Sequence, residues 1–312
     1  MINIIQLKLI LRTPGKRKIL LEILRNKVVS SSELVLKTGL TRQTVNRYLK
    51  ELESAGIVKI RRDTKPWMII LNEEAIKSLE VSRLLPLEGL PIIKQKLEFK
   101  YSWRDFPSCL IQSKTLKLNV VWGSKEISEA STCDAIFVPE IIRELIAYAV
   151  EKGLNIDSIK INSYLDIWAL EDIKILEENM LVIGSGIVNK LTVEIQKIYD
   201  LPICFKPLGG RDLYSSITDT LYESGTEVGM NAGLIGLLPN PWNNSKVIIL
   251  VAGVHAPGTQ AGLLAILDHI RAMRKNQTPI IDNHPKANIP LRVIKAILSP
   301  GSKRVIQYDF LE

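Results

Sequence analysis

The chain has 312 residues, enough for roughly two domains, and its 46% of hydrophobic residues can form a core, which excludes a disordered chain. No apolar run of about 20 residues lacks charges, and the apolar-then-basic start reverses the order of a secretory signal, so we expect neither a membrane span nor export. Three scattered cysteines (Cys109, Cys133, Cys204) without a CxxC pair favour reduced thiols in a cytoplasmic protein. Abundant Ile, Lys and Glu with few Gln are typical of a thermophilic source.

The positive charge is concentrated in the first quarter of the chain. Residues 1–72 hold 15 Lys and Arg against 5 Asp and Glu, a net charge of +10, whereas the whole chain holds 41 against 33. Residues 73–312 therefore hold 26 against 28, a net charge of −2. A basic segment beside a near-neutral remainder predicts a polyanionic partner for that segment alone.

The basic segment begins with the pattern of two short helices. Apolar residues recur at helical spacing at Ile19, Leu20, Ile23 and Leu24, which predicts a first helix. Ser30 and Glu33 have the spacing of a capping box, which predicts that a second helix begins there and runs through Lys37. Gly39 should end it.

A third helix and a hairpin follow. Thr41 can cap this helix, Val45, Leu49 and Leu52 form one apolar stripe, and Gly56 should end it. The runs "IVKIRR" and "PWMIILN", joined by the charged tip "DTK", predict a strand, a turn and a second strand.

Residues 16–72, and above all "TGLTRQTVNRYLKELESAGIVKI", resemble the winged helix-turn-helix family of transcription regulators. The resemblance implies a recognition helix that enters the major groove of double-stranded DNA and a wing that contacts phosphates. Arg, Gln and Asn side chains on that helix can make bidentate contacts to base edges. The alternative is a winged helix used for protein contacts. The predicted DNA-binding residues are Arg42, Gln43, Thr44, Asn46, Arg47 and Lys50 on the helix and Arg61, Arg62 and Lys65 on the wing.

The domain boundary is predicted near residue 90. The sequence divides into a DNA-binding domain over 1–80, a linker with two prolines and a glycine over 81–95, and a second domain over 96–312. A helix-like segment after Asn72 carries Ile76, Leu79 and Leu84, which could mediate a homodimer or pack within one chain.

Residues 96–312 alternate predicted strands with predicted helices, which favours a Rossmann-like α/β domain with a mostly parallel sheet. Residues 233–253, "GLIGLLPNPWNNSKVIILVAG", predict two strands joined by a short loop, so that part of the sheet should be antiparallel.

Two strand–loop–helix units stand out, "LVIGSGIVNKLTVEI" and "IILVAGVHAPGTQAGLLAIL". Glycines allow close backbone approach, and helix N-termini favour anions, so these loops predict a small anionic or nucleotide-like effector; tight turns with capped helices are the alternative. The dinucleotide fingerprint fails, because Asn189 replaces the third glycine and no acidic residue ends the next strand; no P-loop occurs either. The predicted ligand-binding residues are Gly184, Ser185, Gly186, Asn189, Gly253, His255, Gly258, Thr259 and Gln260.

Signs of catalysis are sparse. The three histidines form no metal-binding spacing, so we expect no metal, no cofactor and no catalytic residue. The segment Gly209–Arg211 could contribute an anion contact or a loop salt bridge.

Taken together, the basic winged helix-turn-helix segment and the two glycine loops predict a transcription regulator with a sensing or dimerising domain. Two alternatives remain: a DNA-tethered enzyme acting on a nucleotide through Ser185, Asn189, His255 and Thr259, and an architectural or replication-associated DNA binder.

Overall fold

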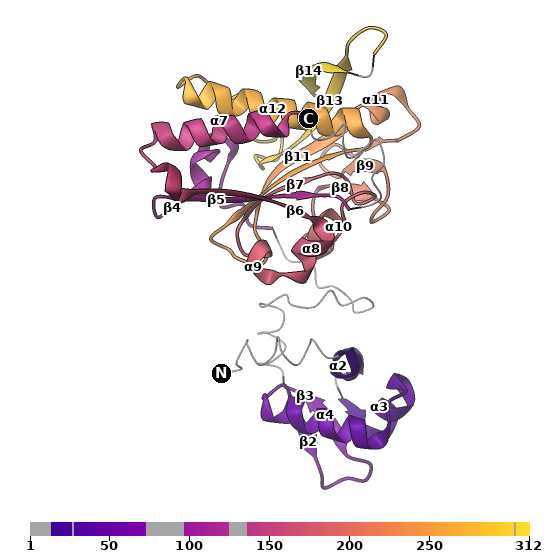
Figure 1. Ribbon diagram of the computed structural model, residues 1–312. Helices are drawn as coiled ribbons and strands as arrows, with labels where there is room; N and C mark the ends of the chain where they lie inside the picture. The colour runs from indigo at the N-terminus through magenta and orange to yellow at the C-terminus, as the bar shows by residue number, and fades with distance from the viewer. Residues whose placement is uncertain (1–13, 27, 73–96, 125–135, 303) are drawn as a thin grey trace. The chain divides into compact units, whose positions relative to one another are not determined.

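The computed structural model describes residues 14–26, 28–72, 97–124, 136–302 and 304–312 (Figure 1). Contacts between Cα atoms divide the chain into two units, Met1–Ile92 and Ile93–Glu312. The predicted linker and the predicted dimerisation helix lie outside the described residues, so the domain limits stay a prediction. Within the described residues, no helix is long and apolar enough to cross a membrane.

The described residues of the N-terminal unit form a winged helix built from helices α2, α3 and α4. Its three-stranded antiparallel sheet has the order β1-β3-β2, so the two predicted strands are joined by a third, β1, that the sequence pattern did not indicate. Apolar residues of all three helices, including Ile19, Leu34 and Leu49, are fully buried against the sheet. The elements are α2 (Pro14–Asn26), β1 (Val28–Ser30), α3 (Ser31–Thr38), α4 (Arg42–Ser54), β2 (Val58–Arg61) and β3 (Met68–Leu71).

The predicted helix caps of this unit are confirmed. The Ser30 side chain accepts a hydrogen bond from the Glu33 amide at 3.2 Å, and the Glu33 carboxylate accepts one from the Ser30 amide at 2.8 Å. Gly39 ends α3 in the left-handed conformation, at φ 68°, where a Cβ would be strained. Thr41 caps α4. These local signals explain why the helices begin and end where they do.

The second unit is built on an eight-stranded mixed sheet in the order β14-β13-β11-β12-β7-β5-β4, with β6 paired to β5. A separate antiparallel sheet has the order β10-β9-β8. The strands are β4 (Ile111–Gln112), β5 (Thr115–Trp122), β6 (Ile159–Leu165), β7 (Asn179–Ile183), β8 (Ile203–Lys206), β9 (Asp212–Ser215), β10 (Thr220–Tyr222), β11 (Ala232–Pro239), β12 (Val247–Gly253), β13 (Leu291–Leu298) and β14 (Val305–Phe310).

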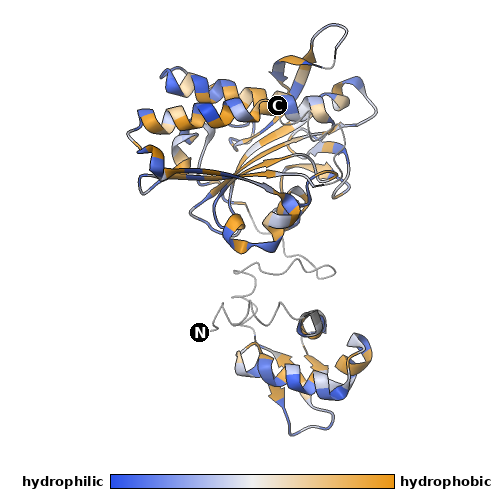
Figure 2. Cartoon of the chain, in the orientation of Figure 1, coloured by the Kyte–Doolittle hydropathy of each residue, from blue (hydrophilic) through white to orange (hydrophobic). Residues whose placement is uncertain are grey.

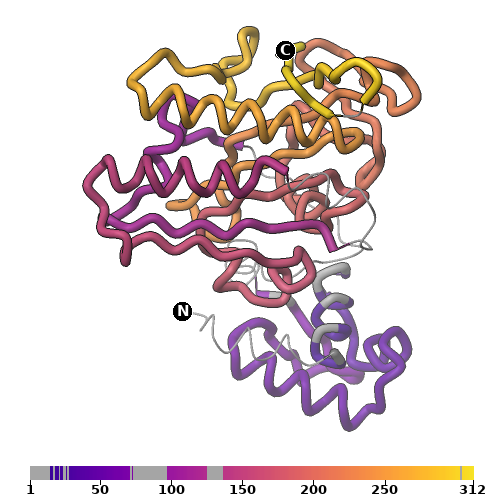
Figure 3. Tube along the Cα trace, turned by 45° about the horizontal axis from the view of Figure 1, so that its top comes forward, coloured from indigo at the N-terminus to yellow at the C-terminus, as the bar shows by residue number. Residues whose placement is uncertain are grey.

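Helices cover both faces of the large sheet. Helices α7 and α12 lie side by side on one face, and α8, α9 and α10 lie on the other (Figures 1 and 3). The helices are α7 (Val138–Glu151), α8 (Asp166–Glu171), α9 (Ile173–Leu176), α10 (Lys190–Ile198), α11 (Glu227–Met230) and α12 (Ala256–Arg274), with short 3-10 helices at Trp103–Asp105, Ser108–Leu110 and Ile156–Ser158. Strands β7 and β12 are buried along their whole length, as their apolar sequences require (Figure 2).

The prediction of a mostly parallel, Rossmann-like sheet is wrong, because more of the strand pairs are antiparallel than parallel. Among the described strands of this sheet, the pairs β6–β5, β5–β7 and β7–β12 are parallel, whereas β4–β5, β11–β12, β11–β13 and β13–β14 are antiparallel. Short connections explain three of these four antiparallel pairs. Residues 113–114, 240–246 and 299–304 are too short for the crossover that parallel neighbours need, so each joins two antiparallel strands.

Candidate functional site

The recognition helix α4 has one buried and one solvent-facing side. Val45, Leu49 and Leu52 are fully buried, as their spacing predicted. The predicted DNA-binding side chains lie on the other side of the helix. Arg42, Gln43, Arg47 and Lys50 are exposed, and Thr44 and Asn46 are partly exposed.

The charges on this face are available to a partner. Within the described part of the unit, no ion pair involves Arg42, Arg47 or Lys50. The Thr44 hydroxyl, in contrast, lies 2.9 Å from the Thr41 hydroxyl that caps the helix. Thr44 is therefore already engaged in the start of α4.

Two residues beside this face were not predicted from the sequence. The ring of Tyr48 lies 5.0 Å from the Arg47 guanidinium and 5.5 Å from the ammonium group of Lys16 on α2. Lys16 also forms an ion pair with Glu51. The basic run "GKRK" was the available signal for Lys16, but its ion pair with Glu51 and its low exposure make Lys16 a contact between α2 and α4 rather than a free charge.

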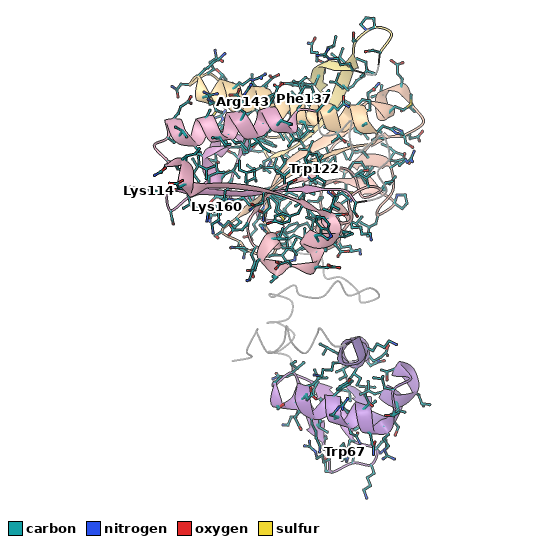
Figure 4. All side chains as sticks on the ribbon, viewed as in Figure 1. Trp67, Lys114, Trp122, Phe137, Arg143 and Lys160 are labelled. Atoms are coloured by element: carbon teal, nitrogen blue, oxygen red, sulfur yellow. The ribbon has the colours of Figure 1, made fainter. Side chains whose placement is uncertain are left out.

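The arginines of the wing are paired, which the sequence could not indicate. Arg62 forms two hydrogen bonds with Glu53 of α4, at 3.1 and 2.5 Å, and Arg61 forms an ion pair with Asp63 at 2.9 Å. Lys65 is exposed, and no ion pair within the described residues involves it. Trp67, labelled in Figure 4, lies under the Arg62 guanidinium with its ring centre 5.6 Å away.

In the second unit, the two glycine loops leave neighbouring parallel strands at the same sheet edge. Ile183 at the end of β7 pairs with Val251 of β12, and the Gly184 amide donates to the Val251 carbonyl at 2.8 Å. The chain passes from β5 to β6 and then back to β7 on the other side of β5. The ends of β5 and β7 therefore form a topological switch point, the usual ligand position in open α/β sheets.

Polar groups at the end of the first glycine loop, residues 184–190, form hydrogen bonds within the protein. The fully buried Asn189 donates to the carbonyls of Val121 and Ile183, at 3.2 and 2.9 Å, and accepts from the Leu191 amide at 2.9 Å. The amide of Lys190, next along α10, donates to the buried carboxylate of Asp166. The start of α10 thus already holds an amide cap and a carboxylate, and this geometry favours a structural role for Asn189.

The glycines of this loop allow close packing. Gly184 has φ 105°, and a Cβ on Gly186 would lie 3.0 Å from the Cα of Gly209. This contact brings the segment Gly209–Arg211 against the first loop, with Arg211 exposed. Ser185 is buried, with 5% of its surface exposed.

The second loop packs the start of α12 against the sheet. The Thr259 hydroxyl accepts from the Gly253 amide at 3.0 Å, and a Cβ on Gly258 would lie 1.9 Å from the Ala232 carbonyl oxygen. Gln260 is buried. His255 is half-buried, and its Nε2 lies 3.4 Å from the Ser224 carbonyl oxygen. Ligand binding by the residues of both loops stays a prediction.

In the described residues no group of three or more His, Cys, Asp or Glu side chains is placed to hold a metal ion.

Comparison with known families supports the assignment of the N-terminal unit. The model of a winged helix-turn-helix DNA-binding family matches residues 16–59, which cover α2 through the start of the wing. No curated protein matches the chain. The match supports DNA as the partner of the first unit, and the second unit remains without an assigned family.

Proposed function

We propose that this protein is a sequence-specific DNA-binding transcription regulator. The observation that carries the proposal is the exposed polar face of α4, where Arg42, Arg47 and Lys50 form no ion pair within the described residues and lie beside Gln43 and Asn46. Arginine can bind guanine edges and Gln or Asn can bind adenine edges when a helix lies in the major groove. The net charge of +10 over residues 1–72 supplies the attraction to phosphates.

The test is to select duplexes from a random-sequence pool with the full chain and to measure affinity as salt rises. We expect log affinity to fall linearly with log salt, because cationic side chains release counterions from DNA. Arg47→Ala should lower affinity by about 1–3 kcal/mol and relax the preference at one position. Lys160→Gln on β6 removes an exposed charge of the second unit and serves as the control. Salt-independent binding, or an unchanged Arg47→Ala variant, would contradict the proposal.

The second unit is proposed to sense a small effector at the switch point between β5 and β7. Adjacent glycine loops on β7 and β12 support this, as does the nearby segment Gly209–Arg211 with its exposed guanidinium. Because Asp166 and Asn189 already occupy the start of α10, an anion would be held by Arg211 and His255 instead.

A thermal-shift screen of the full chain with mononucleotides, cyclic dinucleotides and dicarboxylates tests effector binding. A stabilising compound should lose its effect in the Arg211→Ala and His255→Ala variants, since Arg211 is exposed beside the first loop and His255 is half-exposed in the second. No shift with any of these anions would contradict sensing.

A homodimer is proposed because helix-turn-helix regulators read two half-sites about one helical turn apart, roughly 34 Å. Effector binding would then change the relative placement of the two winged helices and hence the affinity for DNA. Sedimentation of the full chain tests this, and a monomer at all concentrations with DNA bound would contradict it.

A further inference from the structure

Glu53 joins the recognition helix to the wing. It lies in the last turn of α4, and its carboxylate accepts two hydrogen bonds from the Arg62 guanidinium, at 3.1 and 2.5 Å. The same carboxylate accepts a hydrogen bond from the Ile60 amide of β2 at 3.3 Å. The hydrogen bonds from Arg62 hold the pKa of Glu53 below its usual range. Glu53 is therefore ionised at neutral pH, and its carboxylate is hydrogen-bonded both to strand β2 and to Arg62 of the wing.

Arg62 is held on a second side by an aromatic ring. Its guanidinium lies 5.6 Å from the ring centre of Trp67, which precedes β3. A planar guanidinium that is both paired to a carboxylate and stacked on a ring has a defined orientation, which a lysine could not reproduce. These contacts link α4, β2 and the segment before β3 through one side chain.

A DNA phosphate would have to compete with Glu53 for Arg62. Both guanidinium-to-carboxylate bonds are charge-assisted and form a bidentate pair, the geometry that a phosphate would also need. Arg61 is similarly paired with Asp63. Lys65 has no such competitor in the described part of the wing.

We propose that Glu53 withholds Arg62 from the DNA backbone, so that Arg62 positions the wing relative to α4 while Lys65 makes the wing's phosphate contact. This inference rests on the proposed DNA-binding function and reassigns Arg62, which the sequence predicted as a phosphate ligand. Arg62 is thus a positioning residue, and its pairing with Glu53 determines whether it can instead contact a DNA phosphate.

The salt dependence of DNA binding separates the two roles. Each phosphate contact adds about 0.9 to the slope of log affinity against log salt. We expect Lys65→Gln to reduce the slope by about 0.9 and Arg62→Gln to leave it unchanged. Glu53→Gln should increase the slope by about 0.9, because an amide holds the guanidinium less strongly and frees it for a phosphate. A slope reduced by Arg62→Gln as much as by Lys65→Gln would overturn the proposal.

Sequence preference gives a second readout. Arg62→Lys keeps the charge but loses the bidentate pair and the stacking. We expect it to lower the ratio of affinities for the selected and the scrambled duplex as much as Arg62→Gln does. A phosphate ligand would instead tolerate lysine, and a ratio unchanged in Arg62→Lys would contradict positioning.

Controls keep the outcomes separable. Lys160→Gln in the second unit matches the change in charge of Lys65→Gln and Arg62→Gln, the exposed Glu171→Gln matches that of Glu53→Gln, and circular dichroism verifies that each variant keeps its helices. If the wild-type chain binds DNA without any salt dependence, the proposed function fails. If it binds with salt dependence and the Arg62 variants behave as phosphate ligands, only the role of Glu53 fails.

Discussion

The carboxylate of Asp166 accepts a hydrogen bond from the backbone amide of Lys190, with 2.5 Å between the two atoms. Asp166 is fully buried and also accepts from the amides of Ser124, at 2.9 Å, and Ile167, at 2.8 Å. One side chain thus joins the end of β5, the start of α8 and the start of α10. Its negative charge lies at the positive end of the α10 dipole, the place that a phosphate would occupy in a nucleotide-binding loop.

Replacing Asp166 should destabilise the second unit. Asp166→Ala removes the acceptor of three partly buried amides, and we expect a loss of about 2–3 kcal/mol in the free energy of unfolding. Urea denaturation followed by tryptophan fluorescence measures it. Glu171→Ala, at the exposed end of α8, is the matched control and should change stability by less than about 0.5 kcal/mol. Equal stability of both variants would show that the three hydrogen bonds contribute little.

Short-range features of the sequence predicted the first unit well, because capping residues and apolar spacing act within one helix turn. Ser30, Gly39 and Thr41 therefore mark helix ends correctly. Asp166 gave no such signal, since its partner Lys190 is 24 residues away. Asn189 did give one. An Asn before an apolar helix is a cap signal, and Asn189 caps α10, in agreement with the alternative of a tight turn with a capped helix.

Strand pairing was the other feature that sequence could not supply. The strands β7, β11 and β12 lie where the apolar runs before the two glycine loops and the pattern over residues 233–253 predicted strands. An apolar run shows that a strand is buried, but it does not identify its neighbours or their direction. Hence the antiparallel part of the sheet extends further than the hairpin over 233–253 that the sequence indicated.

Asn189 should act as a structural cap, and two substitutions test this. Asn189→Asp keeps the acceptor for the Leu191 amide but places a carboxylate oxygen against the carbonyls of Val121 and Ile183. We expect Asn189→Asp to lower the free energy of unfolding at least as much as Asn189→Ala, by about 2–3 kcal/mol. Urea denaturation provides the measurement. A stable Asn189→Asp variant would indicate that the donor contacts are dispensable and would restore Asn189 as a ligand candidate.

Glu312, which follows β14, lies in a buried polar cluster with residues of the small sheet. Its carboxylate accepts hydrogen bonds from the hydroxyls of Ser215, Thr218 and Tyr222, at 2.7, 2.8 and 2.8 Å. His284 Nε2 lies 3.2 Å from the same carboxylate. Burial raises the pKa of Glu312, but these hydrogen bonds outweigh it and hold the pKa below its usual range.

Removing this carboxylate should therefore destabilise the unit. Glu312→Ala leaves several buried donors unsatisfied, and we expect a loss of about 2–4 kcal/mol at neutral pH. Because the folded state lowers the pKa of Glu312, its contribution is present above the ordinary value of 4.5 and is lost as the pH falls further. Thermal unfolding at several pH values measures both effects. The exposed Glu223→Ala is the control, and a variant as stable as this control would contradict the prediction.

His269 should make the stability of the second unit depend on pH, in a range above the one in which Glu312 acts. It is fully buried on α12, where its Nδ1 accepts from the Ile281 amide at 3.0 Å and its Nε2 lies 3.2 Å from the Phe106 carbonyl oxygen. An imidazole whose Nδ1 accepts a hydrogen bond is neutral, and burial lowers the pKa of His269 from its ordinary value of 6.5. The unfolded chain then binds the extra proton more readily than the folded one does.

The contribution of neutral His269 to the free energy of unfolding is therefore fully present above about pH 6.5. It decreases as the pH falls from there through the lowered pKa that His269 has in the folded state. His269→Met removes the titrating group while keeping an apolar side chain on α12. We expect this variant to lose about 2–3 kcal/mol near pH 8, through its two missing hydrogen bonds, but to lose less stability than the wild type on acidification. Urea midpoints measured between about pH 8 and 5 provide the comparison. Parallel pH profiles for the two proteins would show that His269 titrates equally in the folded and the unfolded chain, which would contradict the role assigned to its burial.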